Sequence, residues 1–211
     1  FEPAVRRQSD CMSEYAAALE RLREMGVLYP CFCTRAEIQA ELAAMAGAPQ
    51  GPEGPHYPGT CRSLCADVRA ARRASGAPFA WRIDAAKAGI GGAPGLGDVV
   101  LSRKETPASY HLAVVVDDAA TGVSLVTRGA DLESATGLHI LLQRLLGLPT
   151  PAYAHHRLIT DETGKRLAKR DRARSLSSLR AQGATPEDIR RILDWPSMEN
   201  EITNRLAASL S

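Results

Sequence analysis

Apolar residues recur every three or four positions near the start of the chain, at Met12, Tyr15, Leu19, Leu22 and Met25. Ser9 or Asp10 stands before this stretch, and Gly26 follows it. Small polar residues are typical helix starts and glycine is a typical helix stop. The pattern therefore predicts an amphipathic helix over residues 10–25.

Shorter apolar runs farther along predict strands over residues 79–83, 99–103, 112–116 and 123–127. The run at 112–116 reads Leu-Ala-Val-Val-Val and is ended by Asp117 and Asp118. A helical pattern covers residues 138–146 and stops at Gly147. Buried strands interleaved with helices indicate an α/β architecture.

The end of the chain has a helical pattern. Thr185 is the expected cap and Pro186 the first-turn residue of one helix, whose inward-facing residues we expect to be Ile189, Ile192 and Leu193. A second short helix is predicted to carry Ile202, Leu206 and Leu210.

The composition fits one principal domain with an insertion or appendage, because the chain has 211 residues, 45% of them hydrophobic, and a net charge of +2. No apolar run approaches the roughly 20 residues of a membrane span, and no signal peptide opens the chain. Five cysteines form no even disulfide set. We therefore expect a soluble cytoplasmic protein with reduced thiols and no membrane partner.

Four of the cysteines form two pairs. Cys31 and Cys33 come directly before a capping box, in which Thr34 is followed by Glu37, so a helix should start at this point. Residues 47–60 contain four glycines and four prolines, as expected for a loop that returns the chain to the first pair. Clustered thiols of this kind are typical of a zinc site.

The spacing of the residues does not decide which two side chains complete the zinc ligand set. Cys61 with Cys65 would give four thiolates, and Tyr57 with Cys61 would give three thiolates and a phenolate. His56 is a third candidate. Spacing alone favours the thiolates, because a phenol with a pKa of about 10 is a poorer ligand at neutral pH.

Basic residues concentrate in residues 157–180, where eight cations and three acids leave a local charge of +5. Such a stretch is either a solvated surface or a phosphate-binding segment. Within it, residues 160–171 read TDETGKRLAKRD and present several cations after a glycine turn, where they could grip a polyphosphate. The glycines of residues 89–97 fit neither common nucleotide-binding spacing, so we interpret them as a plain loop.

The segment GKRLAKRD resembles the KMSKS loop of class I aminoacyl-tRNA synthetases, in the version of the glutamyl type. The segment SYHLAVVVDDAATGVSLVTRGADL is similar to the glutamate-pocket region of that family. LYPCFCTRAEI with HYPGTCRSL resembles the zinc insertion of a shorter paralogue within it. The likeness covers residues 7–175 and keeps the family's order.

This resemblance implies roles for individual residues. It implies Cys31, Cys33, Tyr57 and Cys61 as the zinc ligands, with Cys65 as the runner-up in place of Tyr57. It implies Tyr110 and Arg128 as the glutamate-binding residues. Lys169 is implied as the catalytic lysine that contacts ATP, with Arg166 beside it in the ATP site and Mg²⁺ accompanying the nucleotide.

The resemblance also implies a domain plan and two departures from the family. A Rossmann-like catalytic domain would take residues 1–26 and 71–150, the zinc-binding insertion residues 27–70, and the KMSKS-like loop with a helical stem residues 151–211. Arg166 and Ala168 stand where the family usually has Lys and Ser. The opening strand and HIGH-like motif are missing from the chain, so we expect an N-terminally incomplete catalytic domain.

Only about 40 residues follow the basic loop, and Val114 stands where full-length glutamyl enzymes tend to have Asn. Both features favour the shorter paralogue. The implied function is ATP-dependent activation of glutamate and its transfer to the queuosine base of tRNA(Asp), by a monomer. The alternatives are a fragment of a glutamyl-tRNA synthetase, which charges the tRNA 3′ end, and an inactive, zinc-stabilised RNA-binding module.

Overall fold

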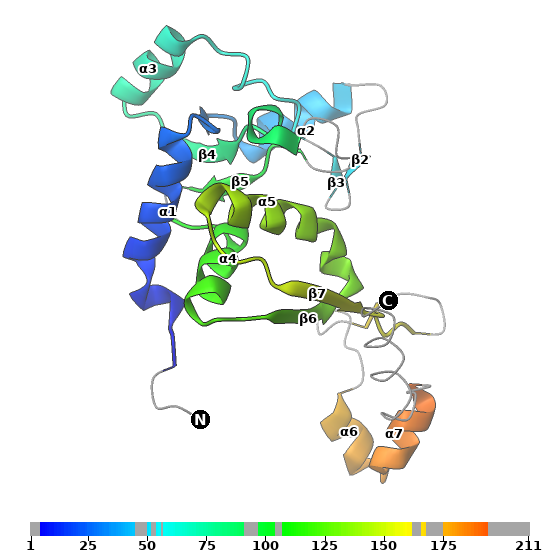
Figure 1. Cartoon of the computed structure of the whole chain (residues 1–211). Coiled ribbons are helices and arrows are strands. Elements are labelled where there is room, and N and C mark those ends of the chain that lie inside the picture. Colours follow the sequence, from blue (N-terminus) through cyan, green and yellow to red (C-terminus); the bar gives the residue numbers. More distant parts are fainter. Residues whose placement is uncertain are drawn as a thin grey trace. The chain divides into compact units, whose positions relative to one another are not determined.

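A computed structural model describes residues 5–44, 50–51, 54–55, 57–90, 97–103, 107–161, 166–167 and 175–193 (Figure 1). The chain divides into two compact units, residues 1–156 and residues 157–211. The first unit holds the sheets and the larger helices, and the second holds two short helices. No helix among the described residues is both long and apolar enough to cross a membrane.

The first unit contains a three-stranded antiparallel sheet in the order β1-β4-β5. Its strands are β1 (Leu28–Cys31), β4 (Ala80–Ile83) and β5 (Val100–Ser102). The apolar runs predicted β4 and β5, but not β1, whose four residues include Pro30. A proline is tolerated in β1 because this strand lies at the edge of the sheet.

Helix α1 (Met12–Glu24) follows the short 3₁₀ helix η1 (Gln8–Asp10), close to the predicted bounds. Its buried residues are Tyr15, Ala18 and Leu22. The predicted stripe was wrong at its two ends, because Met12 and Met25 are 39% and 50% exposed. Ala18 is buried instead, together with Tyr15 and Leu22.

The strand predicted at residues 112–116 is wrong, because these residues lie in helix α4 (Tyr110–Ala120). Ser109 caps this helix by accepting the backbone N–H of Leu112. A short apolar run does not by itself distinguish a buried strand from a buried helix. The weak preference of valine for strands is outweighed here by burial of Leu112, Ala113 and Val115.

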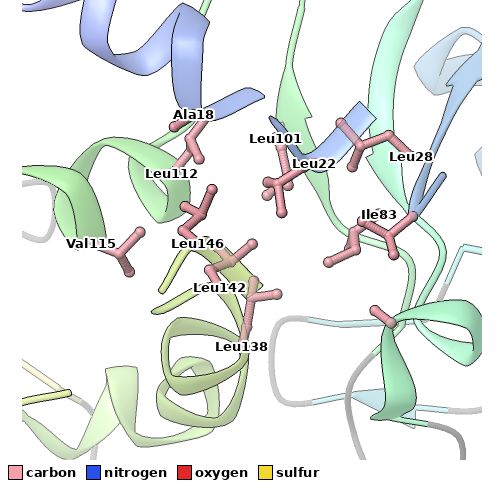
Figure 2. Close-up of a cluster of buried hydrophobic side chains, with 12 residues drawn as sticks. Ala18, Leu22, Leu28, Ile83, Leu101, Leu112, Val115, Leu138, Leu142 and Leu146 are labelled. Atoms are coloured by element: carbon pink, nitrogen blue, oxygen red, sulfur yellow. The ribbon is translucent and has the colours of Figure 1, made fainter. Parts of the chain in front are cut away.

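Helix α5 (Thr136–Leu146) follows the 3₁₀ helix η3 (Ala130–Ala135) and ends at Gly147, whose φ of 62° is left-handed. This end agrees with the prediction. The main hydrophobic core lies between α1, α4, α5 and the three-stranded sheet (Figure 2). Its fully buried large residues are Leu22, Ile83, Leu101, Leu112, Leu138, Leu142 and Leu146.

Strands β6 (Leu125–Gly129) and β7 (Ala152–His156) pair in parallel, and α5 connects them. They run side by side near α4 and α5 in Figure 1. The predicted strand at residues 123–127 overlaps β6, whereas β7 was missed because its Ala-Tyr-Ala-His-His sequence is not an apolar run. A β-α-β unit of this kind places ligand sites at the carboxyl ends of its strands.

The segment with the cysteine pairs contains α2 (Arg35–Ala44), two short strands β2 (Gln50–Gly51) and β3 (Gly54–Pro55), and α3 (Ala66–Ala74). The predicted capping box at the start of α2 is confirmed, since Thr34 and Glu37 bond each other's backbone N–H groups. Helix α3 was not predicted, because none of its residues is buried. Most of the predicted glycine loop lies outside the described residues; it begins in the short helical turn η2 (Ala86–Ile90).

The second unit contains α6 (Leu176–Ala181) and α7 (Pro186–Ile192). The predicted start of α7 is confirmed, because Thr185 forms a capping box with Asp188 and Pro186 occupies the first turn. The prediction that Ile192 faces inward is wrong, since this side chain is 69% exposed. The helix expected around Ile202, Leu206 and Leu210 lies outside the described residues.

Candidate functional site

Arg128 lies near the carboxyl end of β6, where its guanidinium meets α5 and β7. Each of its three nitrogens makes one hydrogen bond. Nε donates to His155 Nε2 at 3.2 Å, Nη1 bonds His139 Nδ1 at 3.0 Å, and Nη2 donates to Thr136 Oγ1 at 2.6 Å. The group also lies over the ring of Tyr153, 5.1 Å from its centroid. The guanidinium is therefore anchored from two elements.

All three acceptors of Arg128 are neutral groups, namely two imidazoles and a hydroxyl. Among the described residues, no carboxylate forms an ion pair with this guanidinium. Arginine has five N–H groups, so one N–H remains on each terminal nitrogen. A guanidinium that keeps an N–H on each terminal nitrogen, and that pairs with no carboxylate among the described residues, could bind a ligand carboxylate.

His139 is the buried centre of this arrangement, since its side chain is 1% exposed. One ring nitrogen contacts Arg128, and the other, Nε2, lies 3.0 Å from His111 Nδ1. Burial, reinforced by His111 and Arg128, lowers the pKa of His139 to about 3. The imidazole is therefore neutral at ordinary pH.

Tyr110, the other residue implied for glutamate, opens α4 and is half exposed. Its ring centroid lies 5.8 Å from that of His139 and 5.5 Å from that of His111. Tyr110 and Arg128 therefore flank the same histidine, although 18 positions separate them in the chain. Their phenol and guanidinium could orient and bind one small anionic ligand.

Sequence reasoning missed the groups that hold Arg128, which are Thr136, His139, His155 and Tyr153. Thr136 and His139 stand three positions apart at the start of α5, so they share one helix face. A polar pair on the buried face of an otherwise apolar helix was the available sign. His155 gave no such sign, because β7 itself was not predicted.

Behind this group, Gln143 continues the same face of α5 and is fully buried. Its Nε2 donates to the hydroxyl of Tyr153 at 3.0 Å. The charge of Arg128 also acts on the carboxyl group of Asp118 on α4. Burial and the neighbouring Asp117 raise the pKa of Asp118, and Arg128 opposes that rise.

A second cluster contains three thiols and a phenol. Cys31 ends β1, Cys33 lies two residues farther on, and Cys61 comes from the loop before α3. The three sulfurs lie within 4.8 Å of one another, and Cys33 Sγ is 3.4 Å from Cys61 Sγ. Tyr57 Oη lies 3.3 Å from Cys33 Sγ. No disulfide joins them, so the thiols are free.

The surroundings favour a thiolate at Cys61 more than at Cys33. Burial raises the pKa of Cys33 to about 12, and the neighbouring thiols add to this rise. Burial acts in the same direction on Cys61, but its pKa is lowered overall by hydrogen bonds from the Phe32 backbone, Tyr57 and Cys33. Burial also raises the pKa of Tyr57, whose oxygen accepts the backbone N–H of Cys61 at 2.9 Å.

The donor set fits a zinc ion. Two sulfurs on one tetrahedral zinc lie roughly 3.8 Å apart, given Zn–S bonds of about 2.3 Å. In the thiol cluster of Cys31, Cys33 and Cys61, one pair of sulfurs lies 3.4 Å apart and all three lie within 4.8 Å of one another. Cys65, which spacing alone favoured, is exposed, lies outside this group and stands at the cap of α3. His56 lies outside the described residues.

The thiol cluster is tied to the sheet by polar contacts. Arg82 on β4 lies over the ring of Tyr57, 4.0 Å from its centroid, and donates to the backbone oxygen of Asp98 at 2.7 Å. The buried carboxylate of Asp98 accepts from the hydroxyl of Tyr29 at 2.6 Å and from Arg62 at 2.9 Å. These contacts fix the loop that carries Tyr57 and Cys61.

The basic loop is described only in part. Arg166 forms an antiparallel bridge with Thr160, so the two sides of the loop lie close together at its base. Lys169 lies outside the described residues, and so does Ala168.

The fold and these residues define a class of protein. Residues 1–208 match the family model "tRNA synthetases class I (E and Q), catalytic domain". The chain therefore belongs to the class I tRNA synthetase family of the glutamate and glutamine type. The family has a mixed α/β catalytic domain, as seen here.

Within this family, the chain is similar to several proteins that share one name. The chain is 48% identical over 212 residues to a protein of Rhodobacter capsulatus named glutamyl-Q tRNA(Asp) synthetase, covering 92% of this chain and 76% of the relative. Relatives of the same name from Nocardia farcinica and Symbiobacterium thermophilum are 47% and 44% identical. They match over 88% and 85% of this chain, which spans 61% and 59% of their lengths.

Solved structures agree on the fold. A glutamate-tRNA synthetase from Elizabethkingia anophelis superposes with a TM-score of 0.61 at 23% identity, covering 78% of this chain and 37% of that one. A glutamate tRNA ligase from Elizabethkingia meningosepticum, solved with its amino acid, gives the same TM-score and identity over 81% and 38%.

The neutral state of His139 predicts a loss of stability in acid. Between pH 6.5 and about 3, the unfolded chain protonates this histidine while the folded chain does not, so the free energy of unfolding falls as pH falls. From pH 7 to pH 5, this one group should account for about 2 kcal/mol. Urea unfolding of the parent and His139→Asn, which does not titrate, measures the difference. Equal pH dependence of the two proteins would contradict a buried neutral imidazole.

Proposed function

We propose that the protein activates glutamate with ATP and transfers the glutamyl group to the queuosine base in the anticodon loop of tRNA(Asp). The observation that carries this proposal is the charge of Arg128, which is held by neutral acceptors and pairs with no carboxylate among the described residues. The name shared by the relatives that are 40–48% identical supports the choice of substrate. Cytoplasmic tRNA would be the natural pool.

In this proposal Arg128 binds a carboxylate of glutamate with the N–H groups left on its two terminal nitrogens. A bidentate contact fixes direction as well as charge. Tyr110 would orient the bound amino acid with its phenol, since its ring flanks His139 on the side of α4. Binding glutamate in one orientation presents the other carboxylate for activation.

The basic loop would serve the nucleotide. The resemblance puts Arg166 and Lys169 against the phosphates of ATP, where cations stabilise the charge that develops as pyrophosphate leaves. Mg²⁺ would accompany ATP. The proposed domain plan keeps the catalytic part in residues 1–26 and 71–150 and the stem in residues 151–211.

We also propose a structural zinc ion bound by Cys31, Cys33, Tyr57 and Cys61. The support is the convergence of three thiols and a phenol from two separate loops. When bound, the metal would add folding free energy to the insertion of residues 27–70, which buries little apolar surface in α2 and α3. These residues would hold the end of β1 to the loop before α3.

The zinc proposal predicts a split between the cysteines. Purified protein should contain one zinc per chain, and Cys31→Ser or Cys61→Ser should lose it, because each removes a thiolate ligand. Cys65→Ser is the matched control and should retain it, since Cys65 is exposed and outside the cluster. Elemental analysis and thermal unfolding with a chelator measure both effects. Full zinc in Cys61→Ser, or loss in Cys65→Ser, would contradict the ligand set.

The glutamate proposal predicts a strong effect at Arg128. Arg128→Ala should weaken glutamate-dependent ATP–pyrophosphate exchange by about 30- to 1000-fold, because a charge-assisted bidentate contact contributes roughly 2 to 4 kcal/mol. Arg128→Lys keeps the positive charge but loses the two-pronged guanidinium, so its exchange activity should lie between those of the parent and Arg128→Ala. The assay uses the complete gene product, with whatever its reading frame encodes ahead of Phe1. Arg144→Ala, on the exposed side of α5, is the control; activity of Arg128→Ala within threefold of it would contradict the role.

A second candidate function is the charging of tRNA(Glu), the reaction named for two of the solved structures that share this fold. Their similarity of 23% identity shows the fold alone. The relatives at 44–48% identity carry the other name, so we rank tRNA(Asp) first.

The choice of tRNA is tested directly. The complete gene product should attach labelled glutamate to tRNA(Asp) that contains queuosine, and not to the same tRNA without that base, because queuosine supplies a nucleophilic hydroxyl that guanine lacks. Residues 157–180, with a charge of +5, would contact the RNA backbone, so binding should weaken as salt rises. Glutamate found on the terminal ribose of tRNA(Glu) would favour the second candidate instead.

A further inference from the structure

We propose that His139 is a positioning residue for Arg128, held in one neutral tautomer by a relay that runs from Arg128 through His139 to His111. The inference rests on the proposed role of Arg128 in glutamate binding. It concerns how that arginine is aimed, and it assigns a function to two histidines that the proposed chemistry does not otherwise use.

The direction of the relay follows from the donors. A guanidinium only donates hydrogen bonds, so His139 Nδ1 must accept the bond from Arg128 Nη1 with its lone pair. The proton of the neutral ring is then on Nε2, which donates to His111 Nδ1 at 3.0 Å. The bond from Arg128 thereby fixes the tautomer of His139, and His111 Nδ1 is the acceptor of its proton.

Groups on three elements face the His139 ring or the arginine beside it. Arg128 comes from β6, and His111 and Tyr110 from α4; His155 and Tyr153 come from β7, and Asp118 of α4 faces Arg128. No carboxylate among the described residues bonds the His139 ring. A second positive charge on a buried ring beside Arg128 is therefore unfavourable, and the ring remains an acceptor.

Because His139 accepts from Arg128, it helps to fix the orientation of the guanidinium. His155 and Thr136 hold Nε and Nη2, and within the part of the chain that the structure describes His139 alone holds Nη1. With all three in place, the plane of the guanidinium is held at each of its nitrogens. Without His139, Nη1 has no protein acceptor and the plane can turn. A misaimed arginine weakens ground-state and transition-state binding alike, so KM for glutamate should rise while kcat changes little.

Three substitutions at residue 139 separate the bond from Arg128 to His139 from the bond between His139 and His111. In His139→Asn, the amide oxygen can take the place of Nδ1 and accept from Arg128. In His139→Gln, the longer amide reaches toward His111 and leaves Nη1 without its acceptor. His139→Leu removes both bonds, and Arg144→Gln on the exposed side of α5 is the control.

We measure glutamate-dependent ATP–pyrophosphate exchange on the complete gene product. His139→Leu and His139→Gln should raise the glutamate KM about tenfold or more, with kcat and the ATP KM within about threefold of the parent. His139→Asn and the control should stay within about threefold of the parent. An unchanged glutamate KM in folded His139→Leu, or a loss in His139→Asn equal to that in His139→Leu, would overturn the proposal.

A spectroscopic measurement keeps the test independent of activity. In ¹⁵N spectra of the parent, His139 should show a bare Nδ1 and a protonated Nε2 from pH 5 to pH 8. The Nε–H signal of Arg128 should be sharp in the parent and in His139→Asn, and broadened in His139→Gln. An imidazolium or the opposite tautomer at His139 would overturn the relay. If the parent lacks exchange activity, the proposed function fails, and these spectra still decide whether His139 aims Arg128.

Discussion

The arrangement of this site depends on the hydrogen bonds between the charged guanidinium of Arg128 and its three neutral acceptors. A partly buried guanidinium usually meets a carboxylate of its own chain, and here it meets two imidazoles and a hydroxyl. The three acceptors satisfy the geometry of the group without cancelling its charge. An anion that reaches this edge is attracted by that charge, and among the described residues it has no ion pair of Arg128 to displace.

The apolar core explains how this polar group can be so precise. Thr136 and His139 share α5 with Leu138, Leu142 and Leu146, which are buried against α1 and α4. The leucines fix the rotation of the helix about its axis, so one face is packed and the adjoining face presents its polar residues to β6 and β7. His111 is fixed in the same way by Leu112 and Val115 of α4.

Local chemistry predicted much of the fold from the sequence. The capping boxes at Thr34 and Thr185, and the glycine stop at Gly147, placed three helix ends, because these interactions lie within one turn. The run at residues 112–116 was assigned to a strand because its apolar pattern lacks periodicity, and only its burial between two helices makes it helical. Strand β1 was missed because its four residues include Pro30, and β7 because Ala-Tyr-Ala-His-His is not an apolar run; both are strands because they pair with β4 and β6.

In the candidate sites, too, local sequence indicated some residues, whereas those brought in from distant elements were missed. The resemblance singled out Tyr110 and Arg128, and the fold brings them to one histidine, but the acceptors of Arg128 come from α5 and β7 and had no local pattern. In the thiol cluster, spacing favoured Cys65 over Tyr57, since it compares residue types and not directions. Helix α3 begins directly after Cys65 and leaves that side chain exposed, whereas the loop before it turns Tyr57 back onto Cys33 and Cys61.

Both sites also share an energetic feature. Converging thiols whose burial opposes ionisation, and a guanidinium held only by neutral groups, are each arrangements that a bound ion of opposite charge would stabilise. A ligand that binds only the folded chain adds stability by mass action, about 2.7 kcal/mol at a hundred times its dissociation constant. The two ions would act in different places, because one cluster joins β1 to the insertion loops and the other joins β6 to α5 and β7. Occupancy of the thiol cluster would therefore stabilise the insertion, and occupancy of the arginine edge would stabilise the β-α-β unit.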